Sequence, residues 1–369
     1  MSRVLMIIDP GLQLWGSERA LAATLKPLTE AWDRVVLVTP PGAALAGLVA
    51  DRATHGPVEV IHTPIGLLHK KSRAARMMAV ARLSLLLARV RPDKIYLNQA
   101  GLCRLLVPLA RWVGVPLVLH VRLLEDVPRV APLRGRVGAP LHQVYISDAM
   151  LPSPPPQEDA YTFIHKAYDP YLFAPEDPRA PGGVANFVSL GRLAQSKGQH
   201  LLVAAMKDPA LNGHAAHIFG EGGPDDPYGV SIKTEAAGQV ADGRVVFHGF
   251  REDATEALSG YRFLVSTSNF ETLGRVVVEA WEKGLMPIVY AGSGGAAEIV
   301  RKSGGGLLYC DWTAESLARA LRTALEMPEA LRAERAARGL NWGRAHLGID
   351  TYQTRLAAVL FETQSTPAS

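Results

Sequence analysis

Short apolar runs rich in β-branched residues alternate with segments of helical length along the chain, and this alternation constrains the fold more than any other feature. Parallel strands need a crossover connection of a dozen or more residues, usually a helix, and are buried on both faces. The first half therefore predicts a parallel sheet with helices on both faces. Its strand-like runs are 3–8, 34–40, 58–62, 94–98, 116–121 and 143–147.

A proline cluster interrupts this alternation near the middle of the chain. PSPPPQED (152–159) can be neither the interior of a helix nor a central strand, and the broken stretch DPRAPGG (177–183) follows it. We place the domain boundary between them and expect domains of residues 1–168 and 169–344. The alternation resumes in the second domain, with strand-like runs at 186–190, 215–220, 244–249, 262–267, 286–291 and 305–310.

Composition supports a folded chain and separates its two halves by charge. Apolar residues make up 48% and charged residues 20%, which excludes a disordered or collagen-like chain. Cys103 and Cys310 lie far apart with no metal-ligand spacing nearby, so neither a disulfide framework nor a structural zinc site is expected. Residues 1–165 hold 19 Lys and Arg against 12 Asp and Glu, and the remainder hold 20 against 23. Halves of opposite sign suggest two domains with different ligands.

The distribution of apolar residues gives no membrane-spanning or secretory signal. The first apolar run, 4–8, is too short for the core of a secretion signal. Arginines interrupt every longer candidate, so no stretch of about 18 uncharged apolar residues is present. We expect a cytoplasmic protein that is soluble or peripheral at the inner face of the membrane.

The segment SNFETLGRVVVEAWEKGLMPIV (268–289) is the most informative for chemistry. We expect a helix to begin near Gly274, which would leave the amides of Leu273 and Gly274 free to hold an anion. Glu271 precedes this helix and Glu279 lies within it among valines and a tryptophan, where a carboxylate needs partners. The alternative is that Glu271 caps the helix and Glu279 is an ordinary solvated residue.

A second segment, VSLGRLAQSKGQHLLVAA (188–205), places two cations between a strand end and a helix start. Arg192 and Lys197 in that position suit a pyrophosphate, although two ordinary surface cations would give the same sequence pattern. The glycine loop around Gly220 follows a further strand.

The first domain also contains two candidate site residues. Gly16 lies in the loop of a strand–loop–helix unit over residues 9–25, where Ser17 is expected to cap the helix. This unit has neither G-x-G-x-x-G nor Walker spacing, which disfavours a dinucleotide or ATP. His120 ends a strand-like run and is expected to point into a cleft between the two domains, although a lone histidine is more often structural.

Together these segments resemble the retaining glycosyltransferases of family 4, the group 1 transferases. The resemblance covers nearly the whole chain and is strongest over 187–308, where GRLAQSKGQ, FGEG, VVFHGF, ETLGRVVVEA and GSGGAAEIV follow in family order. It implies the α/β fold called GT-B, in which two Rossmann-like, doubly wound parallel-sheet domains face each other across a cleft. Residues 1–168 would then bind the acceptor and 169–344 the donor, with a helix in 345–369 crossing back to the first domain.

The resemblance also implies roles for single residues. His120 would face the transferred sugar, Arg192 and Lys197 would bind the diphosphate, Glu271 would contact the donor sugar, and Glu279 would bind the ribose hydroxyls. His120, Glu271, Arg192 and Lys197 form the implied catalytic set. The implied donor-binding set is Gly16, Arg192, Lys197, Gly220, Phe250, Arg251, Glu271, Thr272, Leu273, Gly274 and Glu279.

The activity implied is sugar transfer with retention, from a UDP-sugar more readily than a GDP-sugar, to a hydroxyl of a glycan or lipid-linked acceptor in cell-surface polysaccharide or glycoconjugate synthesis. No Asp-x-Asp signature is present, so we expect no metal. We also expect no cofactor and no nucleic acid partner. Three alternatives stay open: a nucleotide-sugar epimerase of similar fold, a nucleotide-sugar-binding protein without catalysis, and, least favoured, a dehydrogenase.

The stretch HKKSRAARMMAVARLSLLLARVR (69–91) is basic and holds no acidic residue. Met77, Val80, Leu83 and Leu87 recur at helical spacing, which predicts a helix with one apolar and one basic face. The basic face is either simply solvated or, in the sharper interpretation, in contact with anionic lipid.

Overall fold

The computed structural model describes residues 3–14, 16–65, 72–133, 140–165, 186–223, 226–251 and 256–362. The chain divides into two compact units, each described by itself below. Unit 1 combines Met1–Ala167 with Ile349–Ser369, and unit 2 is Tyr168–Gly348. The first domain was expected to end at residue 168, one residue after the observed division, and the second at residue 344, four residues before it. The first division falls within 166–185, outside the described residues.

Unit 1 is built on a seven-stranded sheet in which every pair of neighbours is parallel. The strands are β1 (Val4–Ile8), β2 (Arg34–Thr39), β3 (Val58–His62), β4 (Lys94–Leu97), β5 (Leu117–Val121), β6 (Leu141–Tyr145) and β7 (Tyr161–Phe163). Their order is β3-β2-β1-β4-β5-β6-β7, the doubly wound arrangement with its switch point between β1 and β4. The prediction of the first six strands is confirmed. The sequence analysis missed β7, because three residues beside a proline cluster carry too little pattern.

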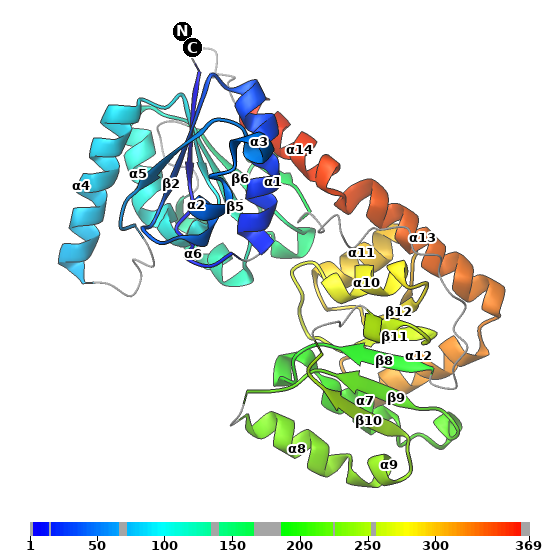
Figure 1. The fold of residues 1–369 in the computed structure, drawn as a ribbon. Coiled ribbons are helices and arrows are strands. Elements are labelled where there is room, and N and C mark those ends of the chain that lie inside the picture. Colours follow the sequence, from blue (N-terminus) through cyan, green and yellow to red (C-terminus); the bar gives the residue numbers. More distant parts are fainter. Residues whose placement is uncertain are drawn as a thin grey trace. The chain divides into compact units, whose positions relative to one another are not determined.

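Helices cover both faces of this sheet. Figure 1 shows α4 and α5 on one face, and α1 and α14 on the other. The helices are α1 (Gly16–Ala31), α2 (Ala44–Leu48), α3 (Arg52–His55), α4 (Arg73–Val90), α5 (Cys103–Val113), α6 (Val127–Val130) and α14 (Ile349–Glu362). One apolar cluster joins α1 and α14 to the sheet, through Leu21, Leu25, Tyr96, Val118 and Leu356 among others.

The apolar face predicted for the basic segment 69–91 is wrong in part. Leu83 and Leu87 are buried as expected, but Met77 is exposed and Val80 only half-buried. The sheet-facing side of α4 is instead Ala79, Leu83, Leu87 and Val90, since the helix sits rotated from the predicted face. Residues 69–71 of this segment lie outside the described residues.

The last helix, α14, is held to unit 1 at both ends. Tyr352, Leu356 and Leu360 are buried in the unit 1 core. Near its C-terminus, Nζ of the fully buried Lys94 donates to the Leu360 carbonyl oxygen at 2.5 Å. A cation at a helix C-terminus satisfies an otherwise unpaired carbonyl and interacts favourably with the dipole. Burial also lowers the pKa of Lys94 to about 8.

Unit 2 repeats the doubly wound plan with six parallel strands. These are β8 (Phe187–Leu190), β9 (Ala216–Phe219), β10 (Val245–Gly249), β11 (Phe263–Ser266), β12 (Met286–Tyr290) and β13 (Leu307–Tyr309). Their order is β10-β9-β8-β11-β12-β13, so the switch point lies between β8 and β11. Each strand-like run predicted in the second half is present.

Two apolar clusters lie on the two faces of the unit 2 sheet. Helices α10, α11 and α13 cover one face, and α7, α8 and α12 the other (Figure 1). The helices are α7 (Gln199–Ala205), α8 (Pro227–Glu235), α9 (Ala237–Ala241), α10 (Arg275–Glu282), α11 (Gly295–Ser303), α12 (Ala314–Glu326) and α13 (Glu329–Leu347).

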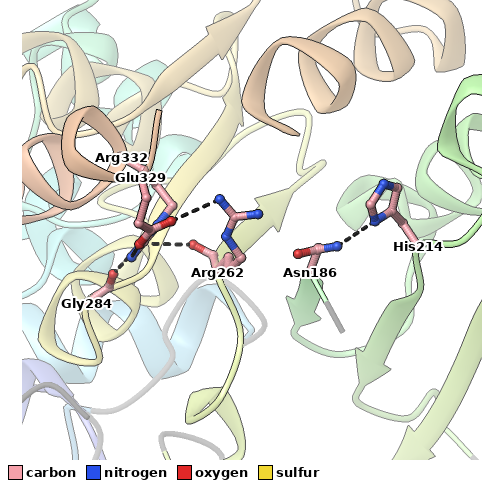
Figure 2. Close-up of polar contacts among 6 residues, drawn as sticks. All are labelled: Asn186, His214, Arg262, Gly284, Glu329 and Arg332. Carbon is pink, nitrogen blue, oxygen red and sulfur yellow. Dashed lines mark hydrogen bonds and ion pairs between the residues drawn. The ribbon is translucent and has the colours of Figure 1, made fainter. Parts of the chain in front are cut away.

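A buried arginine anchors the start of α13 to the amino edge of this sheet. Arg332 Nη1 donates to the carbonyl oxygens of Gly284 at 2.8 Å and Arg262 at 3.4 Å, as Figure 2 shows. The same guanidinium donates through Nε to Glu329 at 2.9 Å, and hydrogen bonding from Arg332 lowers the pKa of that carboxyl. Arg262 and Gly284 precede β11 and β12, so this polar cluster lies at the opposite edge from the strand ends where ligands bind in such folds.

Candidate functional site

The candidate donor site lies at the carboxyl edge of the unit 2 sheet, around its switch point. The loops that follow β8, β11 and β12 come together there, because these strands are direct neighbours. Open α/β sheets bind ligands at this position, outside the carboxyl ends of the strands where the strand order reverses.

Lys197 and Glu271 form an ion pair across the switch point. Lys197 ends a short 3₁₀ segment after β8, Glu271 lies in the loop after β11, and Nζ donates to Oε1. Ser268 Oγ donates to the same Oε1 at 2.7 Å, and Thr267 Oγ1 donates to the Lys197 carbonyl oxygen at 2.7 Å. Both charged side chains are half-buried. The structure thus brings two predicted site residues together and holds them with two hydroxyl groups that the sequence analysis missed.

The loop that carries Glu271 is braced by the loop after β12. The Glu271 amide donates to the Ser293 carbonyl oxygen at 2.8 Å, and the Gly295 amide donates to the Glu271 carbonyl oxygen at 2.7 Å. Ser293 Oγ is buried and has no hydrogen-bond partner. Gly274 is left-handed with φ +84°, and a Cβ there would lie 2.6 Å from Ala296 Cβ. Only glycine fits where this loop meets α11, since any side chain would clash.

The start of α10 follows directly. Leu273 is buried, Gly274 is the residue before the helix, and Thr272 is half-buried, so three successive backbone positions lead into a helix N-terminus. No side chain caps this helix. Glu271 therefore does not act as a cap, and the alternative considered from sequence is wrong on that point.

Glu279 is buried in α10, so it is not an ordinary solvated residue. Only 6% of it is exposed, and Oε1 accepts from Arg275 Nη2 at 3.3 Å, a long contact. One turn further, burial and the Glu279 charge raise the pKa of Glu282 to about 7. Glu282 Oε1 is itself buried, and no described residue forms a hydrogen bond with it. Arg275 was missed from sequence, although its i,i+4 spacing to Glu279 is a recognisable signal.

Arg192, Gly220, Phe250 and Arg251 follow β8, β9 and β10 at the same carboxyl edge. Gly220 has φ +138°, and a Cβ there would lie 1.9 Å from the Gly191 carbonyl oxygen, so the β8 and β9 loops touch through their backbones. Arg192, Phe250 and Arg251 are exposed. Within the described ranges, Arg192 makes no hydrogen bond or ion pair with Lys197 or Glu271.

In unit 1, the His120 side chain is buried rather than exposed to solvent. The ring is fully buried, Nδ1 lies 2.8 Å from the Tyr96 hydroxyl, and the ring stacks on Tyr352 of α14 at 6.3 Å between centroids. Burial lowers the pKa of His120 well below its usual value, so the ring is neutral at pH 7. Its Nε2 has no hydrogen-bond partner among the described residues. That this ring points into a cleft between the domains and contacts a transferred sugar stays a prediction.

A polar network at the carboxyl ends of β1, β4 and β5 was missed from sequence. Arg122 Nη2 donates to Asn98 Oδ1 at 2.6 Å and to the Tyr352 hydroxyl at 2.9 Å, and Asn98 Nδ2 donates to Asp9 Oδ2 at 2.5 Å. Burial raises the pKa of Asp9. The available signal was a polar residue directly after each of three apolar runs, which neighbouring parallel strands bring together.

Gly16 begins α1 beside this network. Ser17 lies inside the helix, and its Oγ donates to Glu18 Oε2 at 2.8 Å, so the predicted cap at Ser17 is wrong. Gln99 Nε2 donates to Glu18 Oε1, which links the start of α1 to the loop after β4.

The described residues contain no group of three or more His, Cys, Asp and Glu side chains placed to hold a metal ion. No helix among them is both long enough and apolar enough to cross a membrane.

The fold of this chain is GT-B, with two Rossmann-like parallel-sheet domains. Residues 173–341, somewhat under half of the chain, match the family described as glycosyl transferases group 1. A solved structure of Anabaena Alr3699/HepE in complex with UDP superposes with a TM-score of 0.72 at 22% identity, over 98% of this chain and all of that one.

Curated relatives match over part of their length. The lipopolysaccharide core biosynthesis glycosyltransferase LpsE of Rhizobium meliloti (strain 1021) is 30% identical over 159 residues, which are 43% of this chain and 44% of that protein. Glycogen synthase of Pseudomonas fluorescens (strain Pf0-1) is 30% identical over 190 residues, 49% of this chain and 37% of that protein. The chain thus spans less than half the length of these relatives. The comparisons thus show the GT-B fold, together with sequence similarity of residues 173–341 to group 1 glycosyl transferases.

Proposed function

We propose that this protein is a retaining glycosyltransferase that uses a nucleoside diphosphate sugar, a UDP-sugar in preference to a GDP-sugar. The acceptor is a hydroxyl of a glycan or lipid-linked sugar in cell-surface polysaccharide or glycoconjugate synthesis. The Lys197–Glu271 pair at the switch point of unit 2, beside the start of α10, carries the proposal. The LpsE relative, named as a lipopolysaccharide core glycosyltransferase, and the UDP complex of HepE support this choice.

A bound diphosphate would replace Glu271 as the partner of Lys197. Lys197 is neutralised by its ion pair with Glu271, and both side chains are partly accessible. A bound diphosphate adds negative charge, so the ammonium turns to it while Ser268 keeps Glu271 in place to accept from a sugar hydroxyl. The exposed Arg192 and the amides of Leu273 and Gly274 would complete the anion site.

These groups would also stabilise the leaving diphosphate, so we propose that no metal is needed. Fixed cations and amides aimed at developing negative charge supply what a divalent ion supplies elsewhere. Attack would come from the face that the diphosphate leaves, with the leaving phosphate helping to take the acceptor proton. We assign no protein nucleophile.

Glu279 would bind the ribose hydroxyls. Its contact with Arg275 is long at 3.3 Å. A pair of hydroxyl donors can therefore replace Arg275 as the partner of Glu279 without leaving the buried carboxylate unpaired. Gly220, Phe250 and Arg251 would border the nucleotide. Gly16 would lie near the phosphates and the acceptor, and His120 would face the transferred sugar. We place the enzyme in the cytoplasm, at the inner face of the membrane.

The test uses the full chain with a panel of UDP- and GDP-sugars, with and without glycan acceptors. Release of nucleoside diphosphate measures turnover, and the anomeric configuration of the product by NMR reports retention. Lys197→Met should lower turnover by about 10- to 150-fold, because a charge-assisted contact is worth about 1.5–3 kcal/mol. Lys207→Met is the matched control, since Lys207 is an exposed lysine of the same unit.

Two results would overturn the proposal. Wild-type turnover in Lys197→Met would remove the diphosphate role, and the absence of nucleotide binding by calorimetry would remove the activity. Formation of an altered nucleotide sugar without acceptor would indicate an epimerase instead.

A further inference from the structure

Helix α4 carries a second apolar face, directed away from the sheet. Its sheet-facing side is Ala79, Leu83, Leu87 and Val90. The side opposite is also apolar and consists of Ala74, Met78, Ala81, Leu85 and Ala88, all exposed, which we call the outer stripe. Their spacing of four, three, four and three residues keeps them on one line along the helix. Met78 is 52% and Leu85 71% exposed, and the neighbouring Met77 is 73% exposed.

Arginines flank the outer stripe and have no acidic partners. Arg82 and Arg89 are seven residues apart, so they lie on the same flank of the helix. Both are exposed, and within the described ranges neither forms an ion pair. Residues 69–91 contain no acidic side chain at all. A monomeric soluble protein seldom shows such a line of apolar side chains to water without a partner for it.

The next helix presents further apolar surface on the same side of the sheet. α5 packs beside α4 (Figure 1), and its last turn exposes Trp112 at 80% together with Val113. Both helices run towards the amino edge of a parallel sheet, so Trp112 and Arg89 lie at the same end of this layer. Tryptophan and arginine are the residues that gather where a membrane meets water.

We propose that α4 lies in the surface of an anionic bilayer. The outer stripe inserts at the boundary of the acyl chains, and Arg82 and Arg89 contact lipid phosphates. An interfacial helix combines these two features, an apolar face and flanking cations. The proposal deepens the function proposed above, on which it rests for the membrane-linked acceptor. It differs from a contact through charge alone, because part of the binding comes from apolar insertion.

Charge argues against a second copy of the chain as the occupant of the outer stripe. Two copies of α4 packed through their stripes would bring Arg82 and Arg89 of each towards the other, with no acidic residue in either segment to compensate. An anionic lipid surface supplies the missing negative charge, worth about fivefold in binding for each arginine near the surface.

Flotation of the full chain with vesicles tests this directly. The vesicles are phosphatidylcholine alone, or phosphatidylcholine with phosphatidylglycerol, at low and high salt. The wild type should float only with the anionic vesicles, and part of this binding should survive high salt. Arg82→Gln with Arg89→Gln should weaken binding about 30-fold at low salt. Met78→Ser with Leu85→Ser should weaken it about tenfold or more at both salt concentrations.

Val230→Ser with Val240→Ser is the matched control. Both valines are exposed, at 67% and 45%, but lie on α8 and α9 of unit 2. This variant should float as the wild type does. Wild-type flotation by the Met78 and Leu85 variant would mean that the cations act alone, and the insertion would be wrong.

Two more measurements complete the test. An environment-sensitive probe on Leu85→Cys, in a Cys310→Ser background, should shift to the blue on anionic vesicles and be quenched by lipids labelled in the acyl chain, whereas Val230→Cys should not respond; Cys103 is buried. An unresponsive probe at Leu85 would overturn the proposal, and so would a wild-type dimer in light scattering that the Met78 and Leu85 variant dissociates. Nucleotide binding by calorimetry is independent of these results, so failure here is distinct from failure of the transferase function.

Discussion

Tyr352 and Tyr309 allow one substitution to be compared at a buried hydroxyl group that has a hydrogen-bond partner and at one that has none among the described residues. Tyr352 is 2% exposed, and its hydroxyl accepts from the buried Arg122 guanidinium at 2.9 Å. Tyr309 is 3% exposed, and its hydroxyl has no hydrogen-bond partner in the part of the chain that the structure describes. Replacing each by phenylalanine removes one oxygen and leaves the ring.

The expected effects have opposite signs. Tyr352→Phe leaves Nη2 of a buried cation with one acceptor fewer, while Nη1 already has none. A hydrogen bond to a charged group contributes about 1.5–3 kcal/mol, so unit 1 should lose about that much free energy of unfolding. Tyr309→Phe removes a buried polar atom that makes no bond, so unit 2 should be unchanged or up to about 1–2 kcal/mol more stable.

Native-state hydrogen exchange read by mass spectrometry is the assay, because it reports each unit separately even if the two unfold in separate steps. Peptides from β5 and α14 should exchange about 10- to 150-fold faster in Tyr352→Phe, while peptides from β13 should not. Equal effects of the two substitutions would refute the reasoning, since the hydrogen bond from Arg122 to the Tyr352 hydroxyl would then contribute nothing to stability.

Four further predictions concern the donor site and the dependence of stability on pH. Arg192→Ala should weaken nucleoside diphosphate binding by about tenfold or more in calorimetry, because it removes a cation from the anion site. Glu279→Gln should weaken binding of UDP itself, whereas Glu271→Gln should leave UDP binding intact and lower sugar transfer; UDP binding as in the wild type by both would remove the ribose assignment. Glu282 has a folded pKa of about 7 against an ordinary 4.5, so the folded state holds more protons between these values and stability should fall as pH rises through that window, a slope that Glu282→Gln removes in denaturant titrations. Lys94 has a folded pKa of about 8 against an ordinary 10.5, so the unfolded state holds more protons and the stability of the wild type relative to Lys94→Met should rise between pH 8 and 10.5; a constant difference would contradict this.

Most of the fold could be predicted, because a buried parallel strand shows itself locally. Each predicted run contains a strand, and the doubly wound class follows from their alternation with helices. The candidate donor site could be predicted in part. Glu271 and Lys197 were both identified, but from separate segments and with no basis in spacing for their ion pair. Ser268 and Thr267 were missed, since hydroxyl residues are common in loops and nothing local marks the two that contact a partner.

Helix α4 shows a different reason for failure. Apolar residues lie on two of its sides, so periodicity alone cannot say which side meets the sheet, and the chosen face included Met77, which is exposed. Burial of Ala79 and Val90 is decided by how the helix docks on its neighbours, a property of the packed unit rather than of the segment.

The amino-acid sequence by itself determined the strands, the helices and the glycine-rich turns, because each depends on side chains within a few residues of one another. Only the tertiary structure decided which charges meet. Lys197 reaches Glu271 across 74 residues of chain, and Arg122 reaches Tyr352 across 230. Those contacts follow from the order of strands in each sheet and from the return of α14 to unit 1. Strand order is a global property of the chain, and no local pattern of residues encodes it.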